Sequence, residues 1–318
     1  MAIDDVRLLW CIDVYAGCVF VVGCKVSLES VGWDDYCKLP FMNASTLVNG
    51  CKSMLRLKRA MDGGFPEETD AMRLGTGIHA LLLEPEEFEN RFCVMPAFEL
   101  DELNLRSPKR KDEPIDDRRT QSKATSYYKN KVEQFLQSCG DKTIIRRDQY
   151  DAALYCIESI RSSEYRRKII DACQKEVTLF GKIGGVRFKG RVDLLRTKRP
   201  LIVDLKTTAN VDKHAFGRQF MNLKYDMKLA IYRELVTQTL GKKPDVAVIT
   251  QEPSGDFDCA YVPVPDIVLD NAWTKVQMLV CKYIQCRDKD VWHGVDGGQD
   301  RYELAIPSWA MEDDEEVD

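Results

Sequence analysis

The chain has 318 residues, of which 44% are hydrophobic; this supplies apolar side chains for a folded core and excludes a disordered or fibrous protein. Its net charge of −5 gives no overall basic field for nucleic acid, so any DNA contact must come from local clusters of Lys and Arg. The twelve cysteines include no CxxC pair, which argues against a zinc or iron–sulfur site and favours reduced thiols in a cytoplasmic protein.

Residues 1–38 are predicted to be an N-terminal extension, and the sequence does not indicate its role. The stretch Leu8–Cys24 is apolar enough to suggest a signal peptide or a membrane span. However, Asp13 interrupts it, and Asp4 and Asp5 stand where a signal peptide carries positive charge. We therefore expect an extra strand or an upstream extension there, and no contact with a membrane.

Helices are predicted to dominate the first half of the chain. Asn43 or Ser45 can cap a helix over residues 47–61, and Gly63 and Gly64 end it. Residues 107–123 are charged, contain two prolines and lack apolar periodicity, which predicts a loop or lid. Further helices are predicted over residues 72–83, 126–137, 147–161 and 163–173.

Strands are predicted to dominate the second half. Three segments rich in Val, Ile, Leu and Phe read as an antiparallel meander over residues 176–182, 186–196 and 201–206. A helix is predicted next, over residues 225–240, and two more strands follow over residues 245–251 and 258–264. The chain then continues with a helix over residues 267–286 and an acidic tail over residues 311–318. Strands flanked in sequence by helices predict an α+β or α/β fold.

The third strand of the meander carries the chemistry. Asp204 and Lys206 are two residues apart, so both side chains point to one face, and Asp193 lies on the preceding strand. If the hairpin brings Asp193 beside Asp204, two carboxylates and an ammonium converge. Carboxylates together with a backbone carbonyl, which Leu205 can offer, suit Mg²⁺ or Mn²⁺.

Such a site can hydrolyse a phosphodiester bond, which needs a positioned water and stabilisation of the charge on the phosphate and the leaving oxygen. Lys206 would orient the water or neutralise developing charge. The alternative for an isolated Asp-x-Lys is an exposed ion pair on a strand. Here the Asp stands in the apolar run Leu201–Leu205, where burying a charge without a partner is costly.

Two segments, Gly190-Arg-Val-Asp193 and Val203-Asp204-Leu-Lys206-Thr-Thr208, resemble the signature of PD-(D/E)xK nucleases. Over about residues 40 to 310 the chain resembles, more narrowly, the RecE-type exonuclease (exodeoxyribonuclease VIII) family. The further motifs that carry this resemblance are Asn43-Ala-Ser, Gly75-Thr-Gly-Ile-His79-Ala-Leu-Leu-Leu-Glu84-Pro and Asp117-Arg-Arg-Thr120. It implies a restriction-endonuclease-like core, with a central mixed sheet flanked by helices, over residues 39–310.

The resemblance also implies the site residues. It points to His79, Asp193, Asp204 and Lys206 as the active site. The predicted metal ligands are Asp193, Asp204, Leu205 and His79, and Glu176 is a further acidic position that can join them. By itself His79 would read as an ordinary helix histidine, and Glu176 as a solvated strand end. Gly75 and Gly77 cost helix stability, which suggests that another backbone or the substrate approaches there.

Candidate contacts to the DNA backbone cluster in sequence around the loop and the core; each by itself can also be an ordinary solvated cation. They are Arg118, Arg119, Lys123, Lys189, Arg191, Lys213 and Arg218. Related nucleases carry a Gln-x-x-x-Tyr pair on the helix after the core, where this chain has Lys228 and Tyr232. The i, i+4 spacing keeps both on one face, so Lys228 can still approach a phosphate.

The resemblance implies an exonuclease that digests one strand of duplex DNA from an end in phage-type recombination and hands the exposed strand to a single-strand annealing protein. It also implies a homo-oligomeric ring, in the cytoplasm of a bacterium or a phage-infected host cell. Two alternatives remain open: a structure-dependent or restriction-type endonuclease of the same fold, and a non-catalytic DNA-binding or assembly protein.

Overall fold

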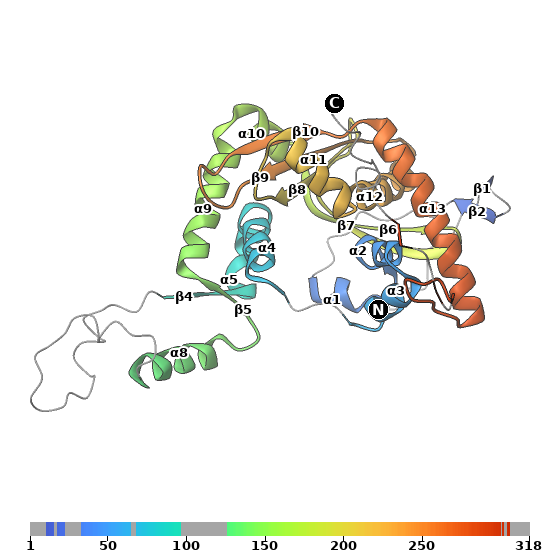
Figure 1. Ribbon diagram of the computed structural model, residues 1–318. Coiled ribbons are helices and arrows are strands. Elements are labelled where there is room, and N and C mark those ends of the chain that lie inside the picture. The colour runs from blue at the N-terminus through green and yellow to red at the C-terminus, as the bar shows by residue number, and fades with distance from the viewer. Residues whose placement is uncertain are drawn as a thin grey trace, which may run out of the picture.

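The computed structural model describes residues 11–15, 18–22, 33–64, 68–96, 126–299, 301 and 304–305. The predicted loop over residues 107–123 and the predicted acidic tail over residues 311–318 lie outside these ranges. Within them the chain folds as mixed α+β around a central six-stranded sheet (Figure 1). No helix in this part of the chain is long and apolar enough to cross a membrane.

The central sheet has the strand order β10-β9-β8-β7-β3, and β6 pairs with β7 off this path. Its strands are β3 (Met42–Asn43), β6 (Gln174–Ile183), β7 (Val186–Arg196), β8 (Leu201–Thr207), β9 (Asp245–Gln251) and β10 (Cys259–Pro263). The pairs β6–β7 and β7–β8 are antiparallel, which confirms the predicted meander. Because β8–β9 and β3–β7 are parallel, the sheet is mixed, and the predicted fold class is confirmed.

Helices cover both faces of the sheet, because its central strands carry apolar side chains in both directions. On one face, Ile202 and Val248 pack with α12 (Tyr225–Leu240) and α13 (Asp266–Lys289). On the other, Val203 and Ile249 pack with α4 (Asp70–Leu83), α9 (Arg147–Ser162) and α10 (Glu164–Asp171).

Smaller elements surround this framework (Figure 1). A parallel pair of strands, β4 (Phe92–Met95) and β5 (Thr143–Arg146), packs beside α4. The apolar stretch near the N-terminus holds two short strands rather than one, β1 (Cys11–Tyr15) and β2 (Cys18–Val22), which form an antiparallel pair. Further elements are α1 (Trp33–Lys38), η2 (Pro85–Glu87), α5 (Phe88–Arg91) and α8 (Ser126–Cys139).

The predicted helix over residues 47–61 is wrong as a single element. The structure divides the segment into α2 (Ala44–Leu47), η1 (Val48–Cys51) and α3 (Met54–Met61). The reason is a second start signal: Ser53 has an extended backbone, and its hydroxyl accepts a hydrogen bond from the backbone N–H of Arg56, so a new helix begins there. Asn43 caps α2, as expected, by accepting from the N–H of Thr46.

Helix α11 (Lys213–Asn222) was not predicted. Its start signal is Asp212, whose carboxylate accepts hydrogen bonds from the backbone N–H groups of His214 and Ala215. An Asp ahead of the apolar pair Phe216 and Phe220, which are four residues apart and both buried, is the pattern that could have identified this helix.

Candidate active site

The site forms where strands β7 and β8 part. Their ladder pairs Leu194 with Val203 and ends there, one step before Asp193 would oppose Asp204. Instead, the Asp193 carboxylate accepts a hydrogen bond of 2.7 Å from the backbone N–H of Leu205. The Asp193 side chain thus takes the place of a strand partner for the Leu205 N–H group, and this hydrogen bond holds the carboxylate between the two strands.

Glu176 lies on β6, at a local irregularity of the backbone. The ladder between β6 and β7 pairs the residues on either side of Glu176 and skips Glu176 itself, whose φ is +51°. This left-handed conformation costs a non-glycine residue on the order of 1 kcal/mol and breaks the regular side-chain alternation. Because Lys175 pairs with Leu194 and Val177 with Val192, Glu176 stands opposite Asp193. One ligand atom from each of His79, Glu176 and Asp193 lies within 4.8 Å of the others.

His79 reaches the cluster from α4. Its Nε2 lies 2.9 Å from the carbonyl oxygen of Leu205, and its Nδ1 lies 3.6 Å from Asp193 Oδ2. Because a carbonyl only accepts hydrogen bonds, Nε2 is the donor in this contact, and Nδ1 is the ring nitrogen that faces the carboxylates and can bind a cation. Two carboxylates and an imidazole nitrogen are a donor set that suits a divalent cation such as Mn²⁺ or Mg²⁺.

Asp204 and Lys206 form a buried ion pair beside this cluster. Lys206 Nζ contacts Asp204 Oδ2, and only 4% of Asp204 is exposed. Burial raises the pKa of Asp204, against the opposing effect of the Lys206 ammonium. Burial lowers the pKa of Lys206, but Asp204 and Asp193 outweigh it, so the net pKa is raised and the ammonium stays charged at neutral pH.

The carbonyl of Leu205, the predicted backbone ligand of the metal, faces two protein donors, and its role as a ligand stays a prediction. It accepts hydrogen bonds from His79 Nε2 and from Lys206 Nζ, the latter at 3.1 Å. A carbonyl oxygen has two lone pairs, and both are used by protein donors. The ladder between β7 and β8 ends before Leu205, and at this point the carbonyl meets the histidine of α4 and the lysine of its own strand.

Lys228 and Tyr232 lie on the face of α12 that is turned toward the sheet. The ring of Tyr225, one turn earlier, lies 5.3 Å from Lys228 Nζ and 5.2 Å from Lys206 Nζ. Burial, and then Lys206, lower the pKa of Lys228. The Tyr232 ring packs against Gly190 of β7, where an added Cβ would lie 3.1 Å from it. The sequence reasoning missed Tyr225, although its i, i+3 spacing to Lys228 was a usable signal.

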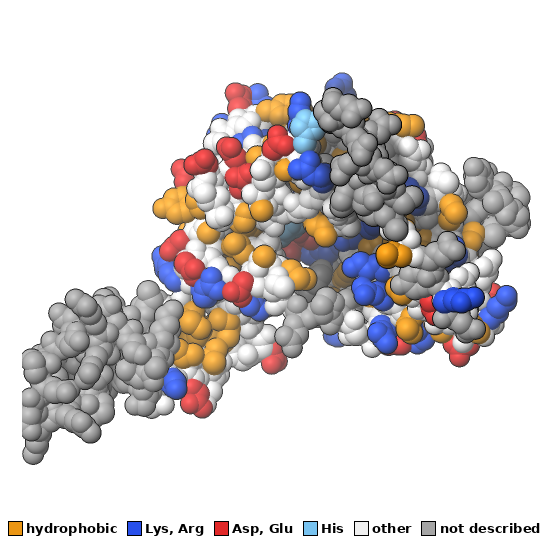
Figure 2. Space-filling view, in the orientation of Figure 1, with side chains coloured by type: hydrophobic (Ala, Val, Ile, Leu, Met, Phe, Trp, Pro, Cys, Tyr) orange, Lys and Arg blue, Asp and Glu red, His pale blue; other side chains and the backbone are white. Residues whose placement is uncertain are grey.

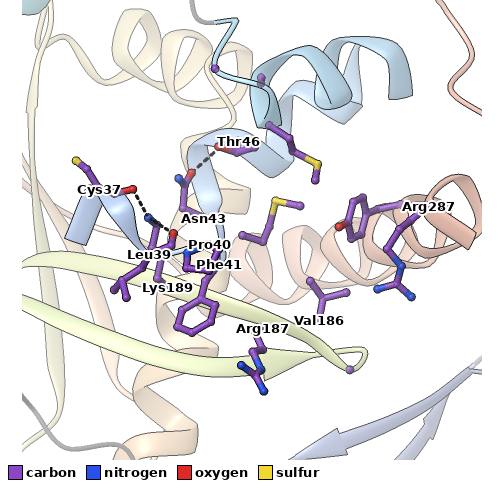
Figure 3. A pocket seen from close by; sticks show the side chains of 16 residues that line it. Cys37, Leu39, Pro40, Phe41, Asn43, Thr46, Val186, Arg187, Lys189 and Arg287 are labelled. Atoms are coloured by element: carbon purple, nitrogen blue, oxygen red, sulfur yellow. Dashed lines mark hydrogen bonds between the residues drawn. The ribbon is translucent and has the colours of Figure 1, made fainter. Parts of the chain in front are cut away.

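Two of the predicted DNA contacts are corrected by the structure. Lys189 is 4% exposed, and its ammonium donates to the carbonyls of Tyr36, Cys37 and Leu39 at 2.7, 3.2 and 2.8 Å. Figure 3 shows the bonds to Cys37 and Leu39. The Arg191 side chain is 8% exposed and binds Glu176 and Glu84. Both cations are held by buried oxygens of the protein itself, so neither presents a charge to a DNA phosphate.

Two further basic residues that were predicted to contact DNA lie in the described part of the chain. Lys213 and Arg218 are exposed on α11. Arg118, Arg119 and Lys123 lie outside the described residues. Figure 2 shows a hollow between α4 on one side and α2 and α3 on the other, with acidic and basic side chains at its floor and Lys and Arg side chains along the edge next to α2 and α3.

The two glycines of α4 meet side chains rather than another backbone. A Cβ on Gly75 would lie 3.2 Å from the Thr207 hydroxyl, and one on Gly77 would lie 2.9 Å from the Ile145 side chain. The close approach expected from these glycines therefore exists, but its partners are the end of β8 and the strand β5. Small residues let α4 lie close enough to β8 for His79 to reach Leu205.

A cavity of about 590 Å³ lies near the β6–β7 turn, lined by residues that include Phe41, Val186, Arg187 and Arg287 (Figure 3). None of His79, Glu176, Asp193, Asp204 and Lys206 lines it. The candidate active site is thus a cluster at the split of two strands and is separate from this cavity.

The chain resembles known proteins in sequence and in fold. Residues 45–301 match a family described as "PDDEXK-like domain of unknown function (DUF3799)". The solved structure of a "putative exonuclease" from Eubacterium rectale superposes with a TM-score of 0.57 at 16% sequence identity, over 89% of this chain and 98% of that one. The solved structure of SSO0001 matches with a TM-score of only 0.27, at 14% identity, over 51% of this chain and 69% of that one. No curated protein matches the chain.

Proposed function

Because the chain belongs to the PDDEXK-like domain family DUF3799, we propose that it is a Mg²⁺-dependent deoxyribonuclease that hydrolyses one strand of duplex DNA from an end. The observation that supports this most directly is the cluster of His79, Glu176 and Asp193 beside the buried Asp204–Lys206 pair, at the point where β7 and β8 part. Carboxylates that can hold a metal ion, with an ammonium beside them, can supply the positive charge and the activated water that phosphodiester hydrolysis uses.

The fit to a divalent cation rests on the donor set. Asp193, Glu176 and Nδ1 of His79 would hold the ion, and Asp204 lies next to them. Mn²⁺ accepts the same oxygen and nitrogen ligands and can replace Mg²⁺. When bound, the ion supplies a Lewis acid for a phosphate oxygen and lowers the pKa of a coordinated water.

The chain's own residues orient the reaction. Asp193 cannot rotate freely, because it accepts a hydrogen bond from the backbone of Leu205. The Lys206 ammonium, fixed by Asp204 and by the carbonyl of Leu205, keeps a positive charge where the attacking water or the phosphate carries negative charge. Lys228, whose ammonium lies beside the same Tyr225 ring, can bind a neighbouring phosphate in place of the Gln of related nucleases.

The preference for DNA ends is supported by the RecE-type motifs of the sequence and by the fold that the chain shares with the "putative exonuclease" from Eubacterium rectale. A role in phage-type recombination with a single-strand annealing protein, and a homo-oligomeric ring around the DNA, rest on those motifs alone. The same fold also serves endonucleases, so substrate topology is the property that separates the two activities.

The decisive experiment compares linear duplex DNA with covalently closed circular DNA. In the presence of Mg²⁺ we expect the linear substrate to release nucleotides and the circle to stay intact, and chelation with EDTA should stop the reaction. Asp204→Asn should lower the rate at least 100-fold, whereas Asp256→Asn, at an exposed turn, should leave it unchanged. Cleavage of the circle would establish an endonuclease instead. Equal rates for wild type and Asp204→Asn would refute the proposed mechanism.

A further inference from the structure

A line of alternating charges runs from the molecular surface to the candidate metal ligands. Arg191 of β7 donates from Nε to Glu176 at 2.5 Å and from a terminal nitrogen to Glu84 at 2.6 Å. The second oxygen of Glu84 accepts from Arg91 of α5 at 3.0 Å. The exposed fractions of these side chains are 25% for Arg91, 21% for Glu84, 8% for Arg191 and 14% for Glu176.

The two carboxylates in this line have different surroundings. Each oxygen of Glu84 has an arginine, so Glu84 is fully engaged by protein donors. Glu176 binds Arg191 through Oε2, while one of its oxygens lies within the cluster with His79 and Asp193. Arg191 can therefore fix the orientation of Glu176 while the carboxylate still faces the position of a cation.

The line also connects two elements that carry ligands. Glu84 is the residue that ends α4, five residues after His79, and Arg191 lies two residues before Asp193 on β7. The Glu84–Arg191 pair thus joins the helix that holds the histidine to the strand that holds the aspartate. Arg191 also lies across the ladder from Thr178, next to the irregular backbone at Glu176.

We infer that Arg191, held by Glu84 and Arg91, is a positioning residue for the metal site, which orients Glu176 toward the cation and fixes α4 relative to β7. This inference rests on the proposed function, because it concerns the same cation. Residues that hold metal ligands in place typically change metal affinity 10- to 100-fold when they are mutated. A planar guanidinium can bridge two carboxylates, and a lysine ammonium of the same charge cannot reproduce that geometry.

The test is Mn²⁺ binding to the full-length protein, measured by titration calorimetry at pH 7.5, with the melting temperature of the metal-free protein as a measure of folding. Arg191→Lys keeps the charge and loses the bridge, and we expect it to weaken Mn²⁺ binding about 10-fold or more. Glu84→Gln should weaken binding in the same direction. Glu86→Gln, an exposed carboxylate two residues away, removes the same charge and should bind Mn²⁺ like the wild type.

The outcomes separate this inference from the proposed function. If Arg191→Lys binds Mn²⁺ as tightly as the wild type, the positioning role is refuted and the metal site stands. If Glu84→Gln and Glu86→Gln weaken Mn²⁺ binding equally, the loss comes from removing one negative charge near the cation and not from the contact with Arg191. The positioning role is then also refuted. If the wild type binds no Mn²⁺, the metal site itself is wrong, and the inference falls with it. If Arg191→Lys melts well below the wild type, its weaker binding can come from poor folding, and Glu84→Gln is then the deciding variant. Weaker Mn²⁺ binding by Glu84→Gln at an unchanged melting temperature supports the positioning role, and unchanged binding refutes it.

Discussion

At the scale of single residues, Lys189 shows how burial changes the meaning of a charge. Next to Gly190 and Arg191 in the sequence, it looked like one of a row of cations for DNA. In the fold its ammonium lies 4.7 Å from the centre of the Tyr36 ring and donates to three carbonyls at the end of α1. It anchors α1 and the chain that leads into β3.

We therefore predict that Lys189→Met lowers stability rather than DNA affinity. The substitution leaves three carbonyls without their donor, which should cost on the order of 3 kcal/mol in the free energy of unfolding. Lys213→Met, at an exposed position of α11, should change it by less than about 0.5 kcal/mol. Urea unfolding measures both, and fluorescence anisotropy measures DNA affinity. A stable Lys189→Met variant with weakened DNA binding would reinstate the contact expected from the sequence.

At the scale of elements, the site depends on how closely α12 approaches the sheet. A Cβ on Gly190 would lie 3.0 Å from the side chain of Leu235 and 3.1 Å from the ring of Tyr232. Both partners belong to α12, the helix that also carries Tyr225 and Lys228. A side chain at position 190 would push this helix away from the strand on which Asp193 lies.

Gly190→Ala is accordingly expected to destabilise the protein by about 1–3 kcal/mol through overpacking. Its matched control is Gly217→Ala in α11, where an added Cβ meets nothing within 4 Å. There, alanine should stabilise the helix by up to about 1 kcal/mol. Thermal unfolding of the two variants, followed by circular dichroism, gives the comparison. Equal effects at the two positions would mean that α12 does not rest on Gly190.

At the scale of the whole molecule, the site should make stability depend on pH. Burial, and then the neighbouring Asp193, raise the pKa of Glu176 to about 7 in the folded protein, from its ordinary value of 4.5. The folded state therefore holds a proton that the unfolded chain has released. The stabilisation is fully present below about pH 4.5 and is lost as the pH rises through 7.

We expect the metal-free protein to lose stability between pH 4.5 and 7 through Glu176, by an amount on the order of 3 kcal/mol at most. Glu176→Gln, which cannot ionise, should flatten this part of the profile. Melting temperatures of both proteins between pH 4.5 and 8.5, in the presence of EDTA, measure the difference. If the two profiles run parallel throughout this range, Glu176 does not carry the raised pKa.

The sequence by itself determined the elements and the fold class. Apolar runs of strand length and helix-period segments depend on local patterns, so the meander, α12 and β9 lie where they were predicted. The spacing of Asp204 and Lys206 placed them on one face for the same reason. Helix α11 and the division at Ser53 were missed although local signals for both were present.

Only the tertiary structure decided which charges meet. Glu176, Asp193 and His79 come from three elements, and they converge through the register of β6 and β7 and the packing of α4 against the sheet. The burial of Lys189 and Arg191 likewise depends on α1 and α4, which lie far from them in sequence. Periodicity fixes the face to which a side chain points. What meets it there is set by packing between elements distant in the chain, and that packing decides whether a cation binds DNA or holds the protein together.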